Sequence, residues 1–113
     1  MVKIAMIGAG SVGFTRTLVM DILAVPELQD AEFRFMDINP ENLEMAANLC
    51  RKMIADNGLS ATLLATTSQR EAIAGADYVI STVRVGGLEA FTYDIEIPLK
   101  YGVDQCVGDT LGP

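Results

Sequence analysis

The fold is decided by one stretch, Gly8-Ala9-Gly10-Ser11-Val12-Gly13, which directly follows an apolar run from Val2 to Ile7. Its spacing matches the G-x-G-x-x-G pattern that joins a strand to a helix in dinucleotide-binding folds. We expect Gly8 to allow a sharp turn, Gly10 to let backbone approach a pyrophosphate, and Gly13 to let the helix pack close on the sheet. The phosphates would lie at a helix N-terminus, where free N–H groups and the positive dipole end converge. All six residues are candidate cofactor contacts, although a glycine-rich corner without a ligand remains an alternative.

Strands and helices alternate along the rest of the chain. The first helix is expected from Ser11 to Ala24, with Phe14 and Val19 among the residues of its apolar face. Pro98 should end or kink the last helix. Strands are expected at 33–36, 62–66, 77–83 and 105–107, and helices at 40–56, 69–74 and 88–97. This alternation predicts an α/β fold with a doubly wound, Rossmann-like parallel sheet.

An acidic residue, Asp37, follows the expected second strand. A carboxylate there can accept hydrogen bonds from both hydroxyls of the adenosine ribose and would repel a 2′-phosphate, which favours NAD over NADP. Ile38 and Asn39 continue this candidate cofactor site, and Asn39 with Pro40 is also a typical helix start. An alternative is that Asp37 serves to open the turn before that helix, and both roles can hold at once.

A second candidate loop follows the expected fourth strand. It contains Val83, Arg84 and the pair Gly86-Gly87, at the sheet edge where doubly wound folds place their ligand crevice. We expect Val83, Arg84 and Gly86 to contact the cofactor, although the glycine pair can be a simple turn and Arg84 a solvated surface charge. Asp109 follows the expected strand 105–107 and would project toward the same crevice. It can equally be a helix cap or a turn former.

Composition narrows the function classes. The 113 residues include 15 acidic and 8 basic side chains, a net charge of −7, which argues against a nucleic-acid partner. There is no His, and the only cysteines are Cys50 and Cys106, so these residues hold no usual metal-ligand spacing and no Ser–His or Cys–His pair. Cys50 falls on the apolar face of the second helix and is expected to be a buried structural thiol. No apolar run has membrane-spanning length and the N-terminus lacks a signal pattern, so we expect a cytoplasmic protein without a membrane partner.

Four motifs stand out along the chain, namely Gly8-Ala9-Gly10-Ser11, Met36-Asp37-Ile38-Asn39, Ile97-Pro98-Leu99-Lys100-Tyr101-Gly102 and Gly108-Asp109-Thr110-Leu111-Gly112-Pro113. Together they resemble glycoside hydrolase family 4, and the resemblance covers the whole chain. The last motif is the most specific and is most similar to the branch of alpha-galactosidases (melibiases), alpha-glucosidases and alpha-galacturonidases.

The resemblance implies an enzyme that hydrolyses O-glycosidic bonds with NAD+ and a divalent metal, usually Mn2+. Hydride leaves carbon 3 of the sugar for the nicotinamide, and a base removes the proton from carbon 2 while the metal stabilises the enediolate. The glycosidic oxygen then leaves carbon 1, water adds, and the hydride returns. Asp109 matches the carboxylate that assists the leaving oxygen as a general acid. The family's metal ligands, a Cys and a His, and its Tyr base would follow Pro113, so Cys106 is not expected to bind the metal.

We therefore expect residues 1–113 to form a dinucleotide-binding domain, the N-terminal part of a two-domain enzyme, that binds NAD+ without turnover by itself. A small-molecule glycoside would be the substrate, and the resemblance implies a homo-oligomeric full-length enzyme. Two alternatives remain. One is the nucleotide-binding half of an NAD-dependent 2-hydroxy-acid dehydrogenase of the malate or lactate type, and the other is a nucleotide-sensing module without chemistry.

Overall fold

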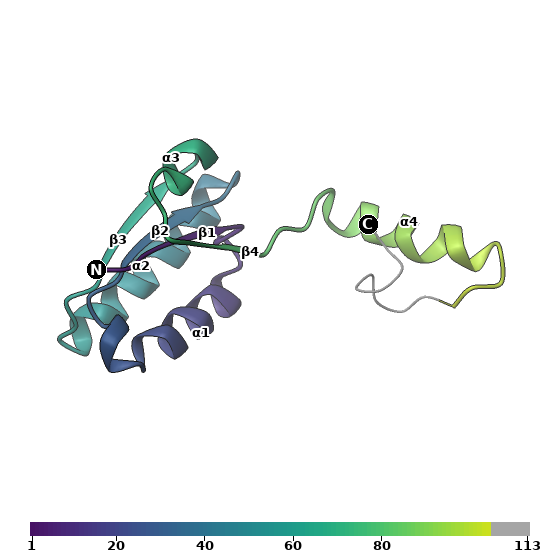
Figure 1. Ribbon diagram of the computed structural model, residues 1–113. Helices are drawn as coiled ribbons and strands as arrows, with labels where there is room; N and C mark the ends of the chain where they lie inside the picture. The colour runs from purple at the N-terminus through teal and green to yellow at the C-terminus, as the bar shows by residue number, and fades with distance from the viewer. Residues whose placement is uncertain (105–113) are drawn as a thin grey trace. The chain divides into compact units, whose positions relative to one another are not determined.

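The computed structural model describes residues 1–104 and contains a sheet of four parallel strands. The strands lie in the order β3-β2-β1-β4, and helices connect them along the chain (Figure 1). The predicted α/β fold with a Rossmann-like parallel sheet is confirmed. The strands are β1 (Lys3–Ile7), β2 (Glu32–Met36), β3 (Thr62–Thr66) and β4 (Tyr78–Ser81), and the connecting elements are α1 (Val12–Leu23), the 3-10 turn η1 (Pro26–Leu28), α2 (Pro40–Asp56) and α3 (Gln69–Ile73).

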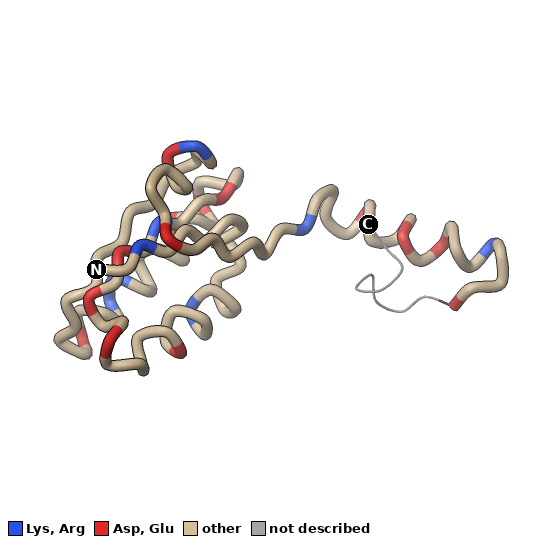
Figure 2. The backbone as a smooth tube through the Cα atoms, viewed as in Figure 1, with Lys and Arg blue, Asp and Glu red and all other residues tan. Residues whose placement is uncertain are grey.

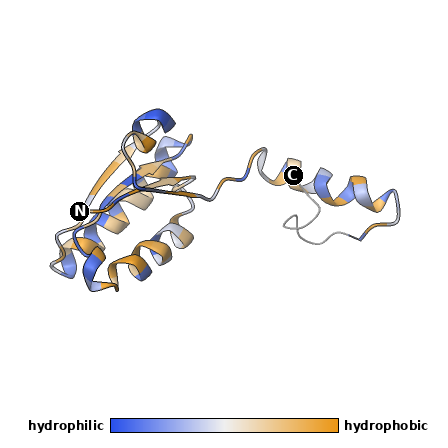
Figure 3. Cartoon of the chain, in the orientation of Figure 1, coloured by the Kyte–Doolittle hydropathy of each residue, from blue (hydrophilic) through white to orange (hydrophobic). Residues whose placement is uncertain are grey.

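The two faces of the sheet are covered unequally. Helices α1 and α2 cover one face, and the short helix α3 covers the other (Figure 1). Because side chains alternate between the faces of a strand, Ile4 and Met6 of β1 and Phe33 and Phe35 of β2 all meet α1 and α2 in the main core. The two phenylalanine rings meet edge to face with their centroids 6.5 Å apart. Figure 3 shows that the orange, hydrophobic residues of these helices gather toward the sheet.

Helix α2 begins and ends at the residues that the sequence predicts. The side-chain oxygen of Asn39 accepts hydrogen bonds from the backbone N–H groups of Glu41 and Asn42, both at 3.0 Å, and Pro40 occupies the first helical position. Gly58, with φ +64, follows the C-terminal end. Local capping residues therefore fix the length of α2.

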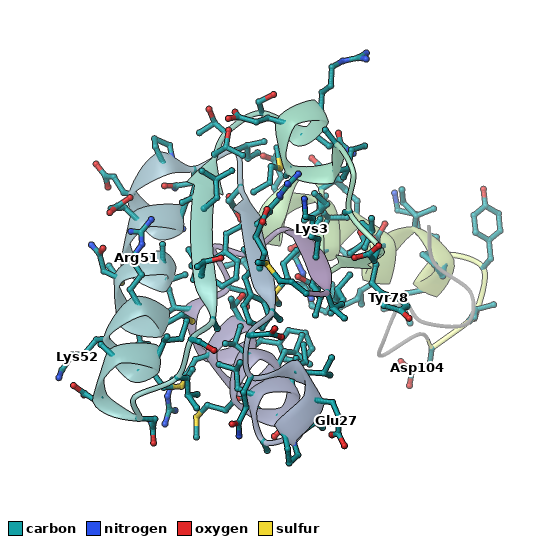
Figure 4. The ribbon with its side chains drawn as sticks, turned by 60° about the vertical axis from the view of Figure 1, so that its left-hand side comes forward. Lys3, Glu27, Arg51, Lys52, Tyr78 and Asp104 are labelled. Atoms are coloured by element: carbon teal, nitrogen blue, oxygen red, sulfur yellow. The ribbon has the colours of Figure 1, made fainter. Side chains whose placement is uncertain are left out.

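Cys50 lies on the inner side of α2 and is fully buried. Burial raises the pKa of its thiol from 9.0 to about 11, against an opposing effect of Arg16. Arg51 and Lys52 project from the outer side of the same helix (Figure 4), where the Lys52 ammonium lies 2.7 Å from the Asp56 carboxylate. The prediction that Cys50 is a structural thiol is confirmed.

Helix α1 buries the expected face except at its start. Val19 and Leu23 are buried, and Leu18 and Ile22 pack against the core, as predicted. The expectation that Phe14 belongs to the inner face is wrong, because Phe14 is 51% exposed and the buried residue of the first turn is Thr15. Strand β4 is also shorter than the expected 77–83, since it ends at Ser81.

The chain divides into two units, Met1–Val83 and a second that begins at Arg84. In the second unit, α4 (Gly87–Leu99) contains Pro98 and ends one residue after it, so the expectation that Pro98 ends this helix holds to within one residue. No helix among residues 1–104 is long and apolar enough to cross a membrane. The assignment of residues 1–113 to one dinucleotide-binding domain stays a prediction.

Candidate functional site

The loop after β1 is tied to the end of β2 by backbone hydrogen bonds. The N–H groups of Gly8 and Ala9 both donate to the carbonyl oxygen of Met36, at 2.9 and 3.0 Å. Gly8 has φ +88, and a Cβ on it would lie 2.4 Å from the carbonyl oxygen of Thr82. The predicted role of Gly8 in the sharp turn is confirmed, because only glycine fits this backbone angle and this approach.

This loop leaves the sheet where the strand order reverses. Strands β2 and β3 lie on one side of β1, and β4 lies on the other. The N–H of Thr82, just after β4, donates to the carbonyl oxygen of Ile7 at 2.8 Å, so the ends of β1 and β4 remain joined. Doubly wound folds bind their ligands outside the carboxyl ends of the strands at such a reversal.

The N-terminus of α1 is open to a ligand. Ser11 occupies the capping position without a side-chain capping hydrogen bond, and the first turn contains no acidic residue. Gly13, in this turn, is exposed, and a Cβ on it would meet no heavy atom within 4 Å. In α2, by contrast, Asn39 caps the first N–H groups. The start of α1 therefore offers N–H groups and a positive dipole end to an anion.

The predicted structural role of Gly13 is wrong. Its lack of a side chain does not serve close packing of the helix on the sheet, because the space around its Cβ position is empty. The residue that ties this turn to the core is Thr15, which is fully buried and whose hydroxyl donates to the carbonyl oxygen of Ala9 at 2.8 Å. Thr15 is not among the predicted site residues. A hydroxyl at a core-facing helix position, which requires a hydrogen-bond acceptor, is the signal that could have found it.

The carboxylate of Asp37 connects the glycine turn to the start of α2. Its Oδ2 accepts a hydrogen bond from the N–H of Gly10 at 2.8 Å, and its Oδ1 accepts one from the N–H of Asn39 at 2.9 Å. The proposed role of Asp37 in opening the turn before α2 is therefore confirmed. Each carboxylate oxygen can accept about two hydrogen bonds, so both retain capacity for a ribose hydroxyl.

The surroundings of Asp37 suit an unphosphorylated ribose. No Lys or Arg follows Asp37 in the sequence until Arg51, and the first turn of α2 carries the acidic Glu41 (Figure 2). A 2′-phosphate on the ribose would face this carboxylate without a cation from the same stretch of chain.

A hollow of about 550 Å3, open to solvent, lies beside Asp37 at the start of α2. Ile38 is one of its lining residues and is 88% exposed. An exposed aliphatic side chain next to Asp37, the predicted ribose acceptor, offers apolar surface to a flat base. The hollow is lined by Ile38, Asn39, Pro40 and Glu41.

The remaining predicted site residues lie at the end of the first unit, in the second unit or outside the described residues. Val83 is exposed and ends the first unit, one residue after Thr82. In the second unit, the guanidinium carbon of Arg84 lies 4.8 Å from the ring centroid of Phe91, and Gly86, with φ +84, precedes α4 as its N-terminal cap. Contacts of these residues with a cofactor stay predictions. Asp109 lies outside the described residues, as do Cys106 and the expected strand 105–107.

Comparison with known proteins identifies the family. The family model for Family 4 glycosyl hydrolase matches residues 3–113. The chain belongs to this family. The alpha-galactosidase of Rhizobium meliloti (strain 1021) is 57% identical to the family 4 chain over 109 residues, which are 96% of the chain and 22% of that protein. The alpha-galactosidase of Bacillus subtilis (strain 168) is 34% identical over 113 residues, 99% of the chain and 26% of that protein. The chain thus spans about a quarter of the length of the curated relatives that it matches.

Solved structures of related enzymes share the fold. The 6-phospho-beta glucosidase from Thermotoga maritima with NAD and glucose-6-phosphate matches with a TM-score of 0.78 and 33% identity, over 91% of this chain and 25% of that chain. The same enzyme with manganese, NAD+ and glucose-6-phosphate matches with a TM-score of 0.78 and 32% identity, over 92% and 24%. The family resemblance that the motifs predict is confirmed.

Among residues 1–104 of the family 4 chain, no three His, Cys, Asp or Glu side chains gather as metal ligands.

Proposed function

We propose that this family 4 protein is an NAD+- and divalent-metal-dependent alpha-glycosidase of the alpha-galactosidase type. The observation that carries the proposal is the arrangement at the strand-order reversal, where the uncapped start of α1 lies beside the anchored carboxylate of Asp37. The alpha-galactosidase of Rhizobium meliloti, 57% identical, supports the sugar class, and the Thermotoga maritima structure with manganese and NAD+ supports the cofactors. Family membership favours this function over a 2-hydroxy-acid dehydrogenase.

The residues of the first unit would bind and orient the cofactor. The first N–H groups of α1 would hold the pyrophosphate, because they have no side-chain cap and the Gly13 backbone is open. The two Asp37 oxygens would each accept a hydrogen bond from one hydroxyl of the adenosine ribose. The adenine would lie against Ile38, in the hollow at the start of α2. The nicotinamide would then extend toward the carboxyl end of β4, after which Val83, Arg84 and Gly86 follow.

NAD+ bound in this way supplies a hydride acceptor for carbon 3 of the sugar and later returns the hydride. Asp109 is proposed as the general acid that protonates the departing glycosidic oxygen. The ligands of the Mn2+ ion and the base that acts at carbon 2 are proposed to lie outside residues 1–113. We also propose that the full-length enzyme is a homo-oligomer and that it is located in the cytoplasm.

Hydrolysis of an aryl alpha-galactoside by the full-length enzyme tests this function. We expect the activity to require both NAD+ and Mn2+, the released galactose to carry solvent deuterium at carbon 2, and no net NADH to accumulate, because the hydride returns in each turnover. Aryl alpha-glucoside and alpha-galacturonide substrates serve as the controls for the sugar. Stoichiometric NADH formation from malate or lactate, without glycoside hydrolysis, would instead establish the dehydrogenase alternative.

A further inference from the structure

We propose that Gly10 determines nucleotide specificity by holding the Asp37 carboxylate in place, a role separate from any contact with the pyrophosphate. The inference rests on the proposed function, since it concerns how NAD+ is distinguished from NADP+. The sequence pattern gives the second glycine a different task, the approach of backbone to pyrophosphate. In the structure the group that approaches Gly10 is a side chain of the protein itself.

Three distances define this approach. The N–H of Gly10 donates to Oδ2 of Asp37 at 2.8 Å, and a Cβ on Gly10 would lie 2.6 Å from Oδ2 and 2.8 Å from Cγ. Real Cβ atoms essentially never come within 3.0 Å of a heavy atom outside their own and adjoining residues, so a side chain at position 10 requires a shift, which the carboxylate at the end of the Asp37 side chain can make. The position in which this carboxylate accepts the hydrogen bond is therefore available only when residue 10 has no side chain.

The carboxylate has a second anchor on the other side. Its Oδ1 accepts from the N–H of Asn39 at 2.9 Å, and Asn39 itself caps α2 through the N–H groups of Glu41 and Asn42. One hydrogen bond on each oxygen fixes the orientation of the carboxylate before a ligand binds. A preorganised acceptor binds the ribose hydroxyls more tightly than a mobile one, because the carboxylate loses little conformational entropy when the ligand binds.

Substitution of Gly10 by Ala separates this role from general folding. The atoms that the new Cβ meets first belong to the end of the Asp37 side chain, which can rotate away, and the Cβ of Asn42, at 3.0 Å, needs to yield by only a few tenths of an ångström. We therefore expect the variant to fold with a displaced carboxylate. Hydrogen bonds to a charged group contribute enough affinity that their loss weakens NAD+ binding about tenfold or more. NADP+ gains nothing from Asp37 and should be weakened less.

Adenosine distinguishes the two possible tasks of Gly10, because it carries both ribose hydroxyls and no phosphate. If Gly10 positions Asp37, Gly10→Ala weakens adenosine and lowers the ratio of NAD+ to NADP+ affinity. If Gly10 only admits the pyrophosphate, the variant weakens both dinucleotides equally and leaves adenosine unchanged. Gly13→Ala is the matched control, since it adds the same methyl group to the same turn with no carboxylate near it.

The experiment measures NAD+, NADP+ and adenosine binding to the protein and its variants by calorimetry and by competition. We expect Gly10→Ala to lower the ratio of NAD+ to NADP+ affinity about tenfold or more, and Gly13→Ala to leave this ratio within about twofold. In a protein that already carries Asp37→Ala, the additional Gly10→Ala substitution should leave the ratio unchanged. Equal weakening of both dinucleotides, with adenosine unchanged, would overturn the proposal.

Hydrogen exchange provides a test that does not require the Gly10→Ala variant to fold. In the ligand-free protein the Gly10 amide should be protected, and Asp37→Ala should remove that protection. A protein that binds NAD+ but whose Gly10 amide exchanges as fast as a free loop amide overturns this inference alone. A protein that binds neither nucleotide overturns the proposed function, and the specificity role of Gly10 fails with it.

Discussion

Replacement of Thr15 by Val tests how the glycine turn is attached to the core. Thr15 and Ala9 are both fully buried, and the Thr15 hydroxyl donates to the Ala9 carbonyl oxygen at 2.8 Å. Val has nearly the same shape as Thr, so the substitution creates no cavity and removes only the donor. Water cannot take the place of the hydroxyl, because neither residue is accessible to solvent.

The expected cost follows from the buried carbonyl. A buried acceptor that loses its partner destabilises a protein by about 1–3 kcal/mol. Thr17→Val is the matched control: it lies on the same helix, and its hydroxyl donates to the Gly13 carbonyl oxygen at 3.0 Å, but it is exposed. Its cost should be about 0.5 kcal/mol or less, since water replaces the lost donor.

Denaturation by urea, followed by circular dichroism, measures both changes in the free energy of unfolding. We expect Thr15→Val to lower the midpoint clearly and Thr17→Val to leave it nearly unchanged, with similar slopes for both. Thr15→Val should also weaken NAD+ binding, because the Ala9 peptide that begins the phosphate turn is no longer held. Equal and small effects of the two variants would refute the reasoning that Thr15 fixes this turn.

In a Cys106→Ser variant, Cys50 should resist a maleimide at pH 8 in the native protein and react after denaturation. Because burial raises the pKa of the Cys50 thiol from 9.0 to about 11, the neutral thiol's contribution to the free energy of unfolding should be lost as the pH rises between these values. Labelling of the native protein at pH 8 would contradict this. Gly8→Ala should destabilise the protein far more than Gly13→Ala, since its Cβ would lie 2.4 Å from the Thr82 carbonyl oxygen at φ +88, and equal melting temperatures would contradict it. In the full-length enzyme, Asp109→Ala should reduce hydrolysis of disaccharide alpha-galactosides more than that of nitrophenyl alpha-galactosides, which have a better leaving group, and should retain deuterium exchange at carbon 2. Equal losses on both substrates, in a folded variant that binds NAD+, would exclude Asp109 as the general acid.

The elements that the sequence predicts well are those fixed by local chemistry. Strand β3 has the predicted bounds, Thr62–Thr66, and α2 begins after the cap Asn39. The predicted inner face of α1 holds for Leu18, Val19, Ile22 and Leu23 and fails only at Phe14, because apolar spacing alone does not show where the edge of a buried face lies. Its packing on the sheet places Thr15 inside instead.

The parts of the site that could not be predicted depend on contacts between distant residues. The Gly10–Asp37 hydrogen bond spans 27 positions and exists only because β1 and β2 pair in parallel and bring their carboxyl ends together. A motif gives each glycine a general role, but only the neighbouring atoms show that Gly10 faces a carboxylate and Gly13 faces open space.

Comparative binding of NAD+ and NADP+ tests the central claim most directly, namely that the turn from Gly8 to Gly13 together with Asp37 holds NAD+. Calorimetry on the unmodified protein should give tighter binding of NAD+, because in the proposed site Asp37 would accept hydrogen bonds from both ribose hydroxyls and would repel a 2′-phosphate. Asp37→Ala should narrow this preference. Equal affinity of the unmodified protein for the two nucleotides, or no effect of the substitution on their ratio, would contradict the claim.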